Sequence, residues 1–224
     1  MRRLVRIFGA VLVAAGVLTL AWVLVVWQWQ DPFTALYTHF EQARLSHTYE
    51  RRAAEFHPRL APADLVSSER RIAADARIYG RTLKEGDPVG RLRIGRIGLN
   101  MMVVQGTDDS TLKRGPGHYV GSALPGQGRL IYIAGHRTTY LAPFAAINDI
   151  RIGDYVSFQV PYGDFTYRVT RHYIVPATAL SVLRDHGSEI LRLQACHPRF
   201  FATHRYIVDA KLVAVSATTP TATP

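Results

Sequence analysis

The hydrophobic and polar positions divide this chain into three stretches with different periods. The first is a run of 21 uncharged residues, Ile7 to Trp27, which is long enough to cross a hydrocarbon core as a helix. From Pro32 to about Phe56, and again from Ala63 to about Tyr79, apolar residues recur at helical spacing among charged ones. From Arg91 to about Ser216, short alternating runs are separated by Gly, Pro and Asp, which is typical of β-strands.

The alternating stretch predicts a mostly β fold. Strands are expected at 91–97, 101–105, 129–135, 154–160, 164–175, 188–195 and 205–215. Short helical pieces are expected at 108–113, 143–149 and 178–184, with Asp108 as a capping signal for the first. Many short strands with turn signals between them favour a β-barrel or a sandwich, and closure into a barrel removes the exposed sheet edges.

Changes in composition predict the domain boundaries. We expect a cytoplasmic tip and transmembrane signal anchor at 1–30, a helical stalk at 31–87, a catalytic barrel at 88–216 and a disordered Thr/Pro tail at 217–224. His57 to Pro62 breaks the stalk, and the turn-rich segment 84–90 ends it. The helix that starts near Pro32 is expected to stand off the membrane or to lie along it.

The first apolar run is expected to remain as a membrane anchor. No small-x-small cleavage site follows it, and a buried core helix would not need so long an uncharged run. Three arginines and no acid precede it, which predicts a cytoplasmic amino terminus and an extracytoplasmic remainder. Indole rings favour the headgroup region, and the three tryptophans lie toward the outer end of the run: Trp22, Trp27 and Trp29. We therefore expect a single-pass plasma-membrane protein held by residues 7–27.

Composition and charge narrow the choice of partner. The chain has 224 residues, 48% of them hydrophobic and 20% charged, which is typical of a globular protein with a membrane segment. Of the net charge of +10, the part from Arg91 onward contributes +7, from fifteen basic and eight acidic residues. Because no helix-turn-helix, RNP-like or zinc-finger spacing is present, nucleic acid is not an expected partner. An anionic cell envelope is the better candidate, with a merely solvated basic surface as the alternative.

Three reactive side chains each lie at the end of an expected strand. The only cysteine, Cys196, ends the alternating run Glu189-Ile-Leu-Arg-Leu-Gln-Ala-Cys196. His136 follows the apolar run 129–135, and Arg205 opens the last strand. A thiol, an imidazole and a guanidinium are the groups needed for attack on a peptide carbonyl: a nucleophile, a proton carrier and an oxyanion stabiliser.

Each of these residues also has a purely structural interpretation. A lone cysteine is commonly a small buried hydrophobe, although an unpaired thiol outside the cytoplasm is an oxidation liability. Arg205 is equally well explained as a surface cation at the start of a strand. His197 is not expected to reach the sulfur of Cys196 as a general base, since neighbouring residues on a strand point to opposite faces. Cys196 and His197 supply only two metal ligands, and no HExxH or CxxC spacing exists, so no metal site is expected.

The order His136, Cys196, Arg205 resembles the sortases, membrane-anchored cysteine transpeptidases of Gram-positive bacteria. Within that family the motifs are most similar to the class E branch of actinobacteria. The resemblance covers about residues 88 to 215 and is carried by Gly115-Pro-Gly-His-Tyr119, Ala123-Leu-Pro-Gly126, Ala134-Gly-His-Arg-Thr-Thr-Tyr140, Ala142-Pro-Phe144 and Cys196-His-Pro198.

The resemblance implies a closed eight-stranded β-barrel and specific roles for these residues. Cys196 would be the nucleophile, His136 the general acid and base, and Arg205 the oxyanion and substrate-positioning group. The implied reaction cleaves a Leu-Ala-x-Thr-Gly-like or Leu-Pro-x-Thr-Gly-like sorting signal between Thr and Gly through a thioacyl-enzyme. An amine of the peptidoglycan precursor would then take the surface protein, and no cofactor is implied. The expected substrate contacts are Thr138, Thr139, Tyr140 and Ala195.

Two positions depart from the family pattern. The family usually has threonine immediately before the cysteine, whereas here Ala195 removes a hydroxyl that would contact the substrate backbone. Asp31-Pro-Phe33 resembles the lid motif of pilin-polymerising sortases, but it directly follows the membrane run, and we interpret it as the start of an interfacial helix. Two other functions stay open: an envelope cysteine hydrolase that uses water as acceptor, and a non-catalytic envelope-binding module with a vestigial triad.

Overall fold

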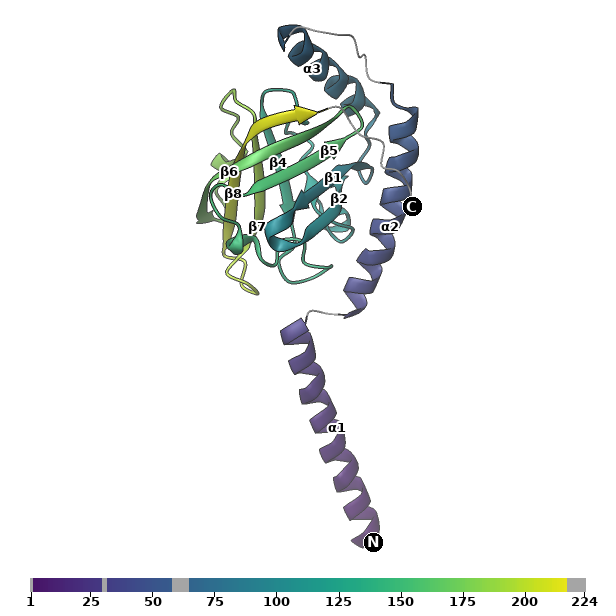
Figure 1. Ribbon diagram of the computed structural model, residues 1–224. Coiled ribbons are helices and arrows are strands. Elements are labelled where there is room, and N and C mark those ends of the chain that lie inside the picture. Colours follow the sequence, from purple (N-terminus) through teal and green to yellow (C-terminus); the bar gives the residue numbers. More distant parts are fainter. Residues whose placement is uncertain (1, 30–31, 58–64, 217–224) are drawn as a thin grey trace.

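The computed structural model describes residues 2–29, 32–57 and 65–216 (Figure 1). Four α-helices are present in these ranges: α1 (Arg2–Trp29), α2 (Pro32–Glu55), α3 (Leu65–Thr82) and α4 (Asp109–Leu112). Eight strands follow the first three helices: β1 (Pro88–Ile94), β2 (Leu99–Gln105), β3 (Gly117–His118), β4 (Leu130–Gly135), β5 (Tyr155–Val160), β6 (Gly163–Pro176), β7 (Ile190–His197) and β8 (His204–Ser216). Three 3-10 turns complete the domain: η1 (Gly95–Ile97), η2 (Ile147–Asp149) and η3 (Leu180–Leu183).

The strands form one closed barrel in the order β1-β2-β3-β4-β7-β8-β6-β5, with β5 pairing back to β1. Two neighbouring pairs, β2 with β3 and β4 with β7, are parallel, and the other pairs are antiparallel. Every strand therefore has a partner on both sides, which removes the exposed sheet edges. The prediction of a closed eight-stranded barrel with short helices is confirmed.

The expected strand positions differ from the observed ones at two places. Strand β3 was missed, because two residues are too short to show an alternating pattern. The run expected at 91–97 ends as a strand at Ile94, since the chain turns through η1 and reaches Gly98 in the left-handed region at φ 64°. The short helix expected near 108 is α4, and Asp108 caps it by accepting hydrogen bonds from the backbone N–H groups of Ser110 and Thr111.

Alternation along the strands divides each one between the barrel interior and its outer face. Inside, residues such as Leu92, Phe158 and Leu193 are fully buried in one hydrophobic core. On the outer face of β7 and β8, Arg192 pairs with Asp209 at 2.6 Å, and both side chains are about as buried as the core. Arg192 also donates to the carbonyl of Val182, which ties η3 down over this part of the sheet.

Helix α2 lies against the side of the barrel, along β1 and β2 (Figure 1). Thr38 donates from Oγ1 to the carbonyl of Lys113 at 2.9 Å. Gln42 bonds to the backbone N–H and carbonyl of Met102, at 2.7 and 3.1 Å. One and two turns further on, Leu45 and Tyr49 are buried in a small cluster with Met102. This helix therefore presents its inner face to the barrel wall.

Helix α3 covers one end of the barrel. The hydroxyl of Tyr79 donates to the carbonyls of Pro88 and Val89 at 3.1 and 3.0 Å, where β1 begins. Its ring packs against Phe56 and Tyr162, with ring centroids 5.6 and 5.8 Å apart. The segment expected to break the stalk, and the expected tail at 217–224, lie largely or wholly outside the described residues.

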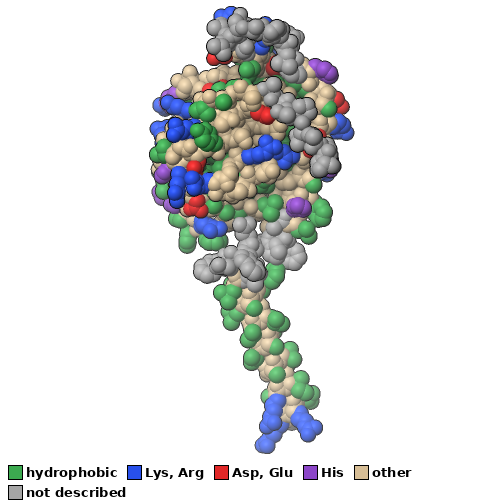
Figure 2. All heavy atoms as spheres, viewed as in Figure 1, with side chains coloured by type: hydrophobic (Ala, Val, Ile, Leu, Met, Phe, Trp, Pro, Cys, Tyr) green, Lys and Arg blue, Asp and Glu red, His purple; other side chains and the backbone are tan. Residues whose placement is uncertain are grey.

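Helix α1 projects from the domain as a stem covered with hydrophobic side chains, with basic residues at its far end (Figure 2). Its stretch Arg2–Leu24 has a mean hydropathy of 2.5 and no buried residue, so the helix is long and apolar enough to cross a membrane. Only two residues separate α1 from α2, whose first turns lie at the end of the barrel nearest α1 (Figure 1).

Candidate active site

An apolar floor lies on the outer face of the barrel where β4, β7 and β8 run side by side. Tyr132 and Ala134 of β4 and Ile207 of β8 are buried together there, although their neighbours in sequence face the interior core. Val182 of η3 closes the cluster from above. Position 136 continues the outward-facing series of Tyr132 and Ala134, and position 196 continues that of Arg192 and Gln194 on β7.

The strand register brings the expected thiol, guanidinium and imidazole to one end of this floor. Cys196 and Arg205 are directly opposite each other in the antiparallel pair β7–β8, so their side chains share a face. Gly135 pairs with Ala195 in the parallel pair β4–β7, and His136 therefore follows at the level of Cys196. The thiol is free and partly exposed, as a nucleophile that meets a peptide must be.

His136 lies in a partly buried position with a polar atom left open. Its Nε2 is buried and has no hydrogen-bond partner among the described residues. The ring rests against that of Tyr140, with centroids 5.3 Å apart. Burial lowers the pKa of His136; the carboxylate of Asp109 opposes this effect and the ammonium of Lys113 adds to it. At neutral pH the neutral form of the ring therefore predominates.

The loop after His136 is tightly folded. A Cβ at Gly135 would come within 2.7 Å of the Phe144 ring, so a glycine here lets this aromatic side chain approach the backbone closely. Tyr140, Leu141 and Ala142 all have positive φ, at 53°, 59° and 36°, a conformation that costs a non-glycine residue about 1 kcal/mol or more. Such backbone is retained only where the surroundings hold it.

The expected substrate contacts divide into two groups. Thr138, Thr139 and Tyr140 are all partly exposed in this loop, next to His136. Ala195, by contrast, points into the barrel interior with 1% of its surface exposed. Because β7 alternates and Cys196 faces outward, the side chain at position 195 lies behind the floor, and only its backbone is near the site.

Arg205 is engaged with the backbone of the loop between β7 and β8. Its Nη1 donates to the carbonyl of Ala202 at 2.8 Å and to that of His204 at 3.0 Å. This guanidinium therefore shapes the loop that borders Cys196. The remaining N–H groups of Arg205 have no hydrogen-bond acceptor among the described residues.

Sequence reasoning missed Arg137, which lies directly behind the thiol. Its side chain is 6% exposed, and Nη1 donates to the carbonyl of Cys196 at 3.2 Å and to Nδ1 of His197 at 2.9 Å. Nη2 donates to Oδ1 of Asn148 at 2.7 Å. No carboxylate of the described chain forms an ion pair with it, and burial, together with the charge of Arg199, lowers the pKa of Arg137. The signal in the sequence was a charged residue directly after the expected base.

The other histidines near the site have different surroundings. His197 faces away from the thiol and accepts from Arg137, and burial lowers its pKa. His204 is exposed and contacts the hydroxyl of Thr203. His118, which belongs to a motif shared with the sortases, is 1% exposed in the barrel wall. Within the part of the chain that the structure describes, no three His, Cys, Asp or Glu side chains gather as metal ligands.

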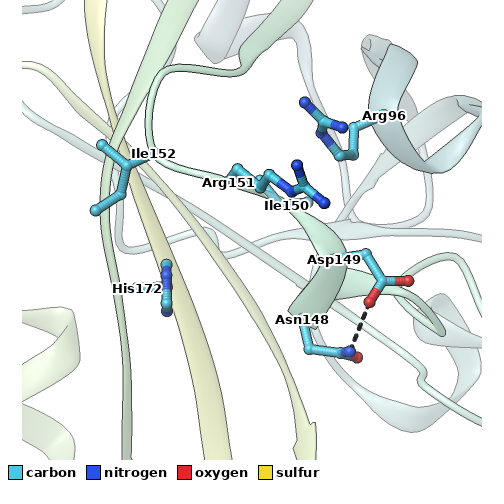
Figure 3. Close-up of a pocket in the computed structure, with 7 residues that line it drawn as sticks. All are labelled: Arg96, Asn148, Asp149, Ile150, Arg151, Ile152 and His172. Atoms are coloured by element: carbon cyan, nitrogen blue, oxygen red, sulfur yellow. Dashed lines mark hydrogen bonds between the residues drawn. The ribbon is translucent and has the colours of Figure 1, made fainter.

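A cavity of about 530 Å³ opens on a different part of the surface, between η2 and β6 (Figure 3). Cys196, His136 and Arg205 are not among the residues that line it: Arg96, Asn148, Asp149, Ile150, Arg151, Ile152 and His172. Asn148 connects the two regions, because it donates to Asp149 and accepts from Arg137. The reactive groups therefore lie at the end of the apolar floor and not in this cavity.

Comparison with known proteins identifies a family over the residues that form the barrel. The family model for the Sortase domain matches residues 92–213. Sortase D of Bacillus subtilis (strain 168) is 33% identical over 132 residues, which is 57% of this chain. The match spans 65% of the length of that relative.

Solved structures include two relatives from Streptomyces. Sortase E from Streptomyces avermitilis superposes with a TM-score of 0.54 at 33% identity, covering 60% of this chain and 93% of that one. Sortase E1 from Streptomyces coelicolor, solved with a tripeptide in its active site, gives a TM-score of 0.56 at 24% identity, covering 59% of this chain and 91% of that one. At 24% identity, the similarity to the Streptomyces coelicolor structure is one of fold alone.

Proposed function

This chain belongs to the sortase family, and we propose that it is a membrane-anchored cysteine transpeptidase that joins surface proteins to the cell wall. The observation that carries the proposal is the register of β4, β7 and β8. It supports a site in which Cys196, His136 and Arg205 act together at the end of one apolar floor.

In the first half of the reaction, the Cys196 thiolate attacks the threonine carbonyl of a sorting signal. The carbon–sulfur bond forms, the carbonyl oxygen gains charge, and the free N–H groups of Arg205 donate to it. The threonine–glycine bond then breaks, and His136 gives its proton to the leaving amine. Thioacyl-enzyme and a peptide with an amino-terminal glycine are the products.

In the second half, an amine of the peptidoglycan precursor attacks the thioester. Neutral His136 takes the proton from the attacking nitrogen, the new amide bond forms, and the Cys196 thiolate leaves. The lowered pKa of His136 favours this step, because the ring is already in its basic form at neutral pH. The first step instead needs His136 in its protonated form, so that the ring can give a proton to the leaving amine.

Arg137 supports the nucleophile from behind. It holds the carbonyl of Cys196, and it brings a buried positive charge that is not neutralised by an ion pair among the described residues. The sequence places the arginine next to the base, and the fold turns it toward the nucleophile.

The substrate proposal rests on the chemistry of the floor. Tyr132, Ala134 and Ile207 form, with Val182 of η3, a buried apolar cluster that borders the site, and an apolar border suits the leucine and the proline or alanine of a Leu-Pro-x-Thr-Gly-like or Leu-Ala-x-Thr-Gly-like signal. We place the amino-terminal arginines in the cytoplasm, α1 across the plasma membrane and the barrel outside. The domain scheme of anchor, helical segment, catalytic barrel and tail belongs to this proposal.

The test is a mass-spectrometric turnover assay on the full chain in detergent micelles. Peptides with each signal are incubated with and without a glycine or diaminopimelate amine, and Cys196→Ala is the matched control. A ligated product that requires the amine and is absent with Cys196→Ala supports the transpeptidase. Cleavage with water alone assigns a hydrolase, and the absence of any thioacyl adduct on Cys196 assigns a non-catalytic envelope-binding module.

A further inference from the structure

The loop between β7 and β8 exposes an aromatic pair beside the active site. Phe200 and Phe201 are 63% and 77% exposed. Phe200 and Ala202 adopt positive φ, at 73° and 53°, in the short segment that connects the thiol strand to the Arg205 strand. Two neighbouring exposed phenylalanines at a loop tip form a contiguous apolar patch, and such patches mark sites of interaction with a protein or a membrane.

A second apolar group lies on the first turns of α2. Leu36, Tyr37 and Phe40 are 56%, 49% and 66% exposed, although the opposite side of the same helix is packed on the barrel. These residues follow the apolar helix α1 within a few positions. They therefore lie close to the point where the chain leaves the bilayer in the proposed topology.

Both groups lie at one end of the domain, and the active site is between them. The N–H of Tyr140, in the loop after His136, approaches Oγ1 of Thr34 at 3.4 Å, which places the start of α2 at the active-site loop. The β7–β8 loop descends from the barrel on the side that faces α1 (Figure 1). Figure 2 shows hydrophobic side chains on that end of the domain, next to the stem.

The charge around the aromatic pair matches an anionic surface. Arg199 precedes the pair, with its guanidinium 5.9 Å from the Phe200 ring centroid, and Arg205 follows it. From Ala195 to Val208 the sequence holds no Asp or Glu. Aromatic rings flanked by basic side chains are typical of segments that lie in the headgroup region of anionic membranes.

We propose that the tip of the β7–β8 loop, Phe200 and Phe201, inserts into the headgroup region of the membrane that α1 spans. Together with Leu36 and Phe40 it forms a second contact with the bilayer, which holds Cys196 just above the lipid surface. Reactants that are themselves tied to the membrane then meet the thiol without diffusing into bulk water. This inference rests on the proposed membrane anchor of the proposed function.

The first experiment measures the depth of the loop independently of turnover. In a full-length Cys196→Ala chain, Phe201→Cys carries an environment-sensitive fluorophore, and the protein is reconstituted into phosphatidylcholine–phosphatidylglycerol vesicles. Val213→Cys is the matched control, because Val213 is an exposed apolar residue of β8 at 51% exposure. Val213 is nine positions beyond His204, where β8 leaves the loop, and therefore lies about 30 Å from the loop along an extended strand.

Nitroxides at defined depths in the lipid are expected to quench the label at 201 several-fold more than the label at 213, and aqueous iodide should give the reverse order. Equal quenching at the two positions would overturn the proposal. Quenching that instead follows the protein-to-lipid ratio would assign the loop to contacts between copies. A chain that does not float with the vesicles would refute both the anchor and the docking.

The second experiment separates docking from catalysis. With Phe200→Ser and Phe201→Ser combined, transpeptidation of a vesicle-anchored substrate should fall about tenfold, because the loop loses its apolar contact with lipid. Turnover of a soluble peptide should stay within about twofold of the parent chain. An equal loss on both substrates would assign the pair to peptide binding. Absence of turnover in the parent chain would refute the transpeptidase but leave the depth measurement valid.

Discussion

Acid is expected to destabilise this protein through His118, a histidine in the wall of the barrel on strand β3. Its ring is 1% exposed, and Nε2 lies 2.9 Å from the carbonyl oxygen of Ala123. Burial lowers the pKa of His118 from 6.5 to about 4, against a small opposing effect of the bond to Ala123. A neutral ring has one N–H to donate, either from Nε2 to the carbonyl of Ala123 or from Nδ1 to Oε1 of Gln105, which lies 2.8 Å away.

The direction in which pH changes the free energy of unfolding depends on whether the folded or the unfolded state binds more protons. The unfolded chain protonates His118 near pH 6.5, whereas the folded chain does so only near pH 4. Between these values the unfolded state holds the extra proton, so the free energy of unfolding falls as the pH is lowered. The stability is present above pH 6.5 and lost as the pH falls to about 4. The difference between the two pKa values corresponds to about 3 kcal/mol, of which about 2.5 kcal/mol is lost by pH 4.5.

The assay is urea unfolding of the full chain in micelles at pH 7.5 and pH 4.5, with His118→Gln as the comparison. All three tryptophans lie in α1, so near-ultraviolet circular dichroism of the tyrosines reports on the barrel. Carboxylates and the other histidines titrate in both proteins and cancel in the difference. The parent chain should lose about 2.5 kcal/mol more than the variant over this interval. The same pH dependence in both proteins would refute the reasoning.

Three further changes test the site and its supports. Arg137→Gln is expected to slow alkylation of Cys196 by iodoacetamide about tenfold, because the backbone of the nucleophile loses its buried cationic donor, with partial rescue by Arg137→Lys; an unchanged alkylation rate would leave only a packing role. Gln42→Leu removes the bonds from α2 to Met102 and to the carbonyl of Arg114, and it should cost about 2 kcal/mol and speed amide exchange in α2 selectively. Arg192→Leu leaves the buried Asp209 with Arg171 as its remaining ion-pair partner, and urea unfolding should show a free energy of unfolding lower by about 3 kcal/mol. Arg171→Leu, at the exposed end of the same network, should lower it less.

The sequence by itself was sufficient for features that depend on local periodicity. Alternation over six or more residues is visible in a sequence, and it located β4 through β8 to within a few residues. The apolar run that became α1 and the cap at Asp108 are equally local signals. The motifs around His136 and Cys196 identified the family, which the match over residues 92–213 confirms. The roles of the three reactive residues remain predictions.

Tertiary structure decided everything that depends on which strands are neighbours. Alternation shows that Ala195 and Cys196 face opposite ways, but only the barrel makes one face the core and the other the floor. Likewise, the sequence does not distinguish a catalytic from a structural histidine, since His118 and His136 both belong to shared motifs, yet one is enclosed in the wall and the other lies at the open edge of the floor.

The contacts of Arg137 and of α2 are further features that the sequence alone does not show. Arg137 reaches the carbonyl of Cys196, 59 positions along the chain, because β4 and β7 run parallel and adjacent. Gln42 bonds to Met102, 60 positions away, because the helix is packed against the barrel. A repeating pattern reflects the average environment of each residue, which is local information. The partner of a side chain is set by the closure of the whole barrel, and no short stretch of the sequence contains it.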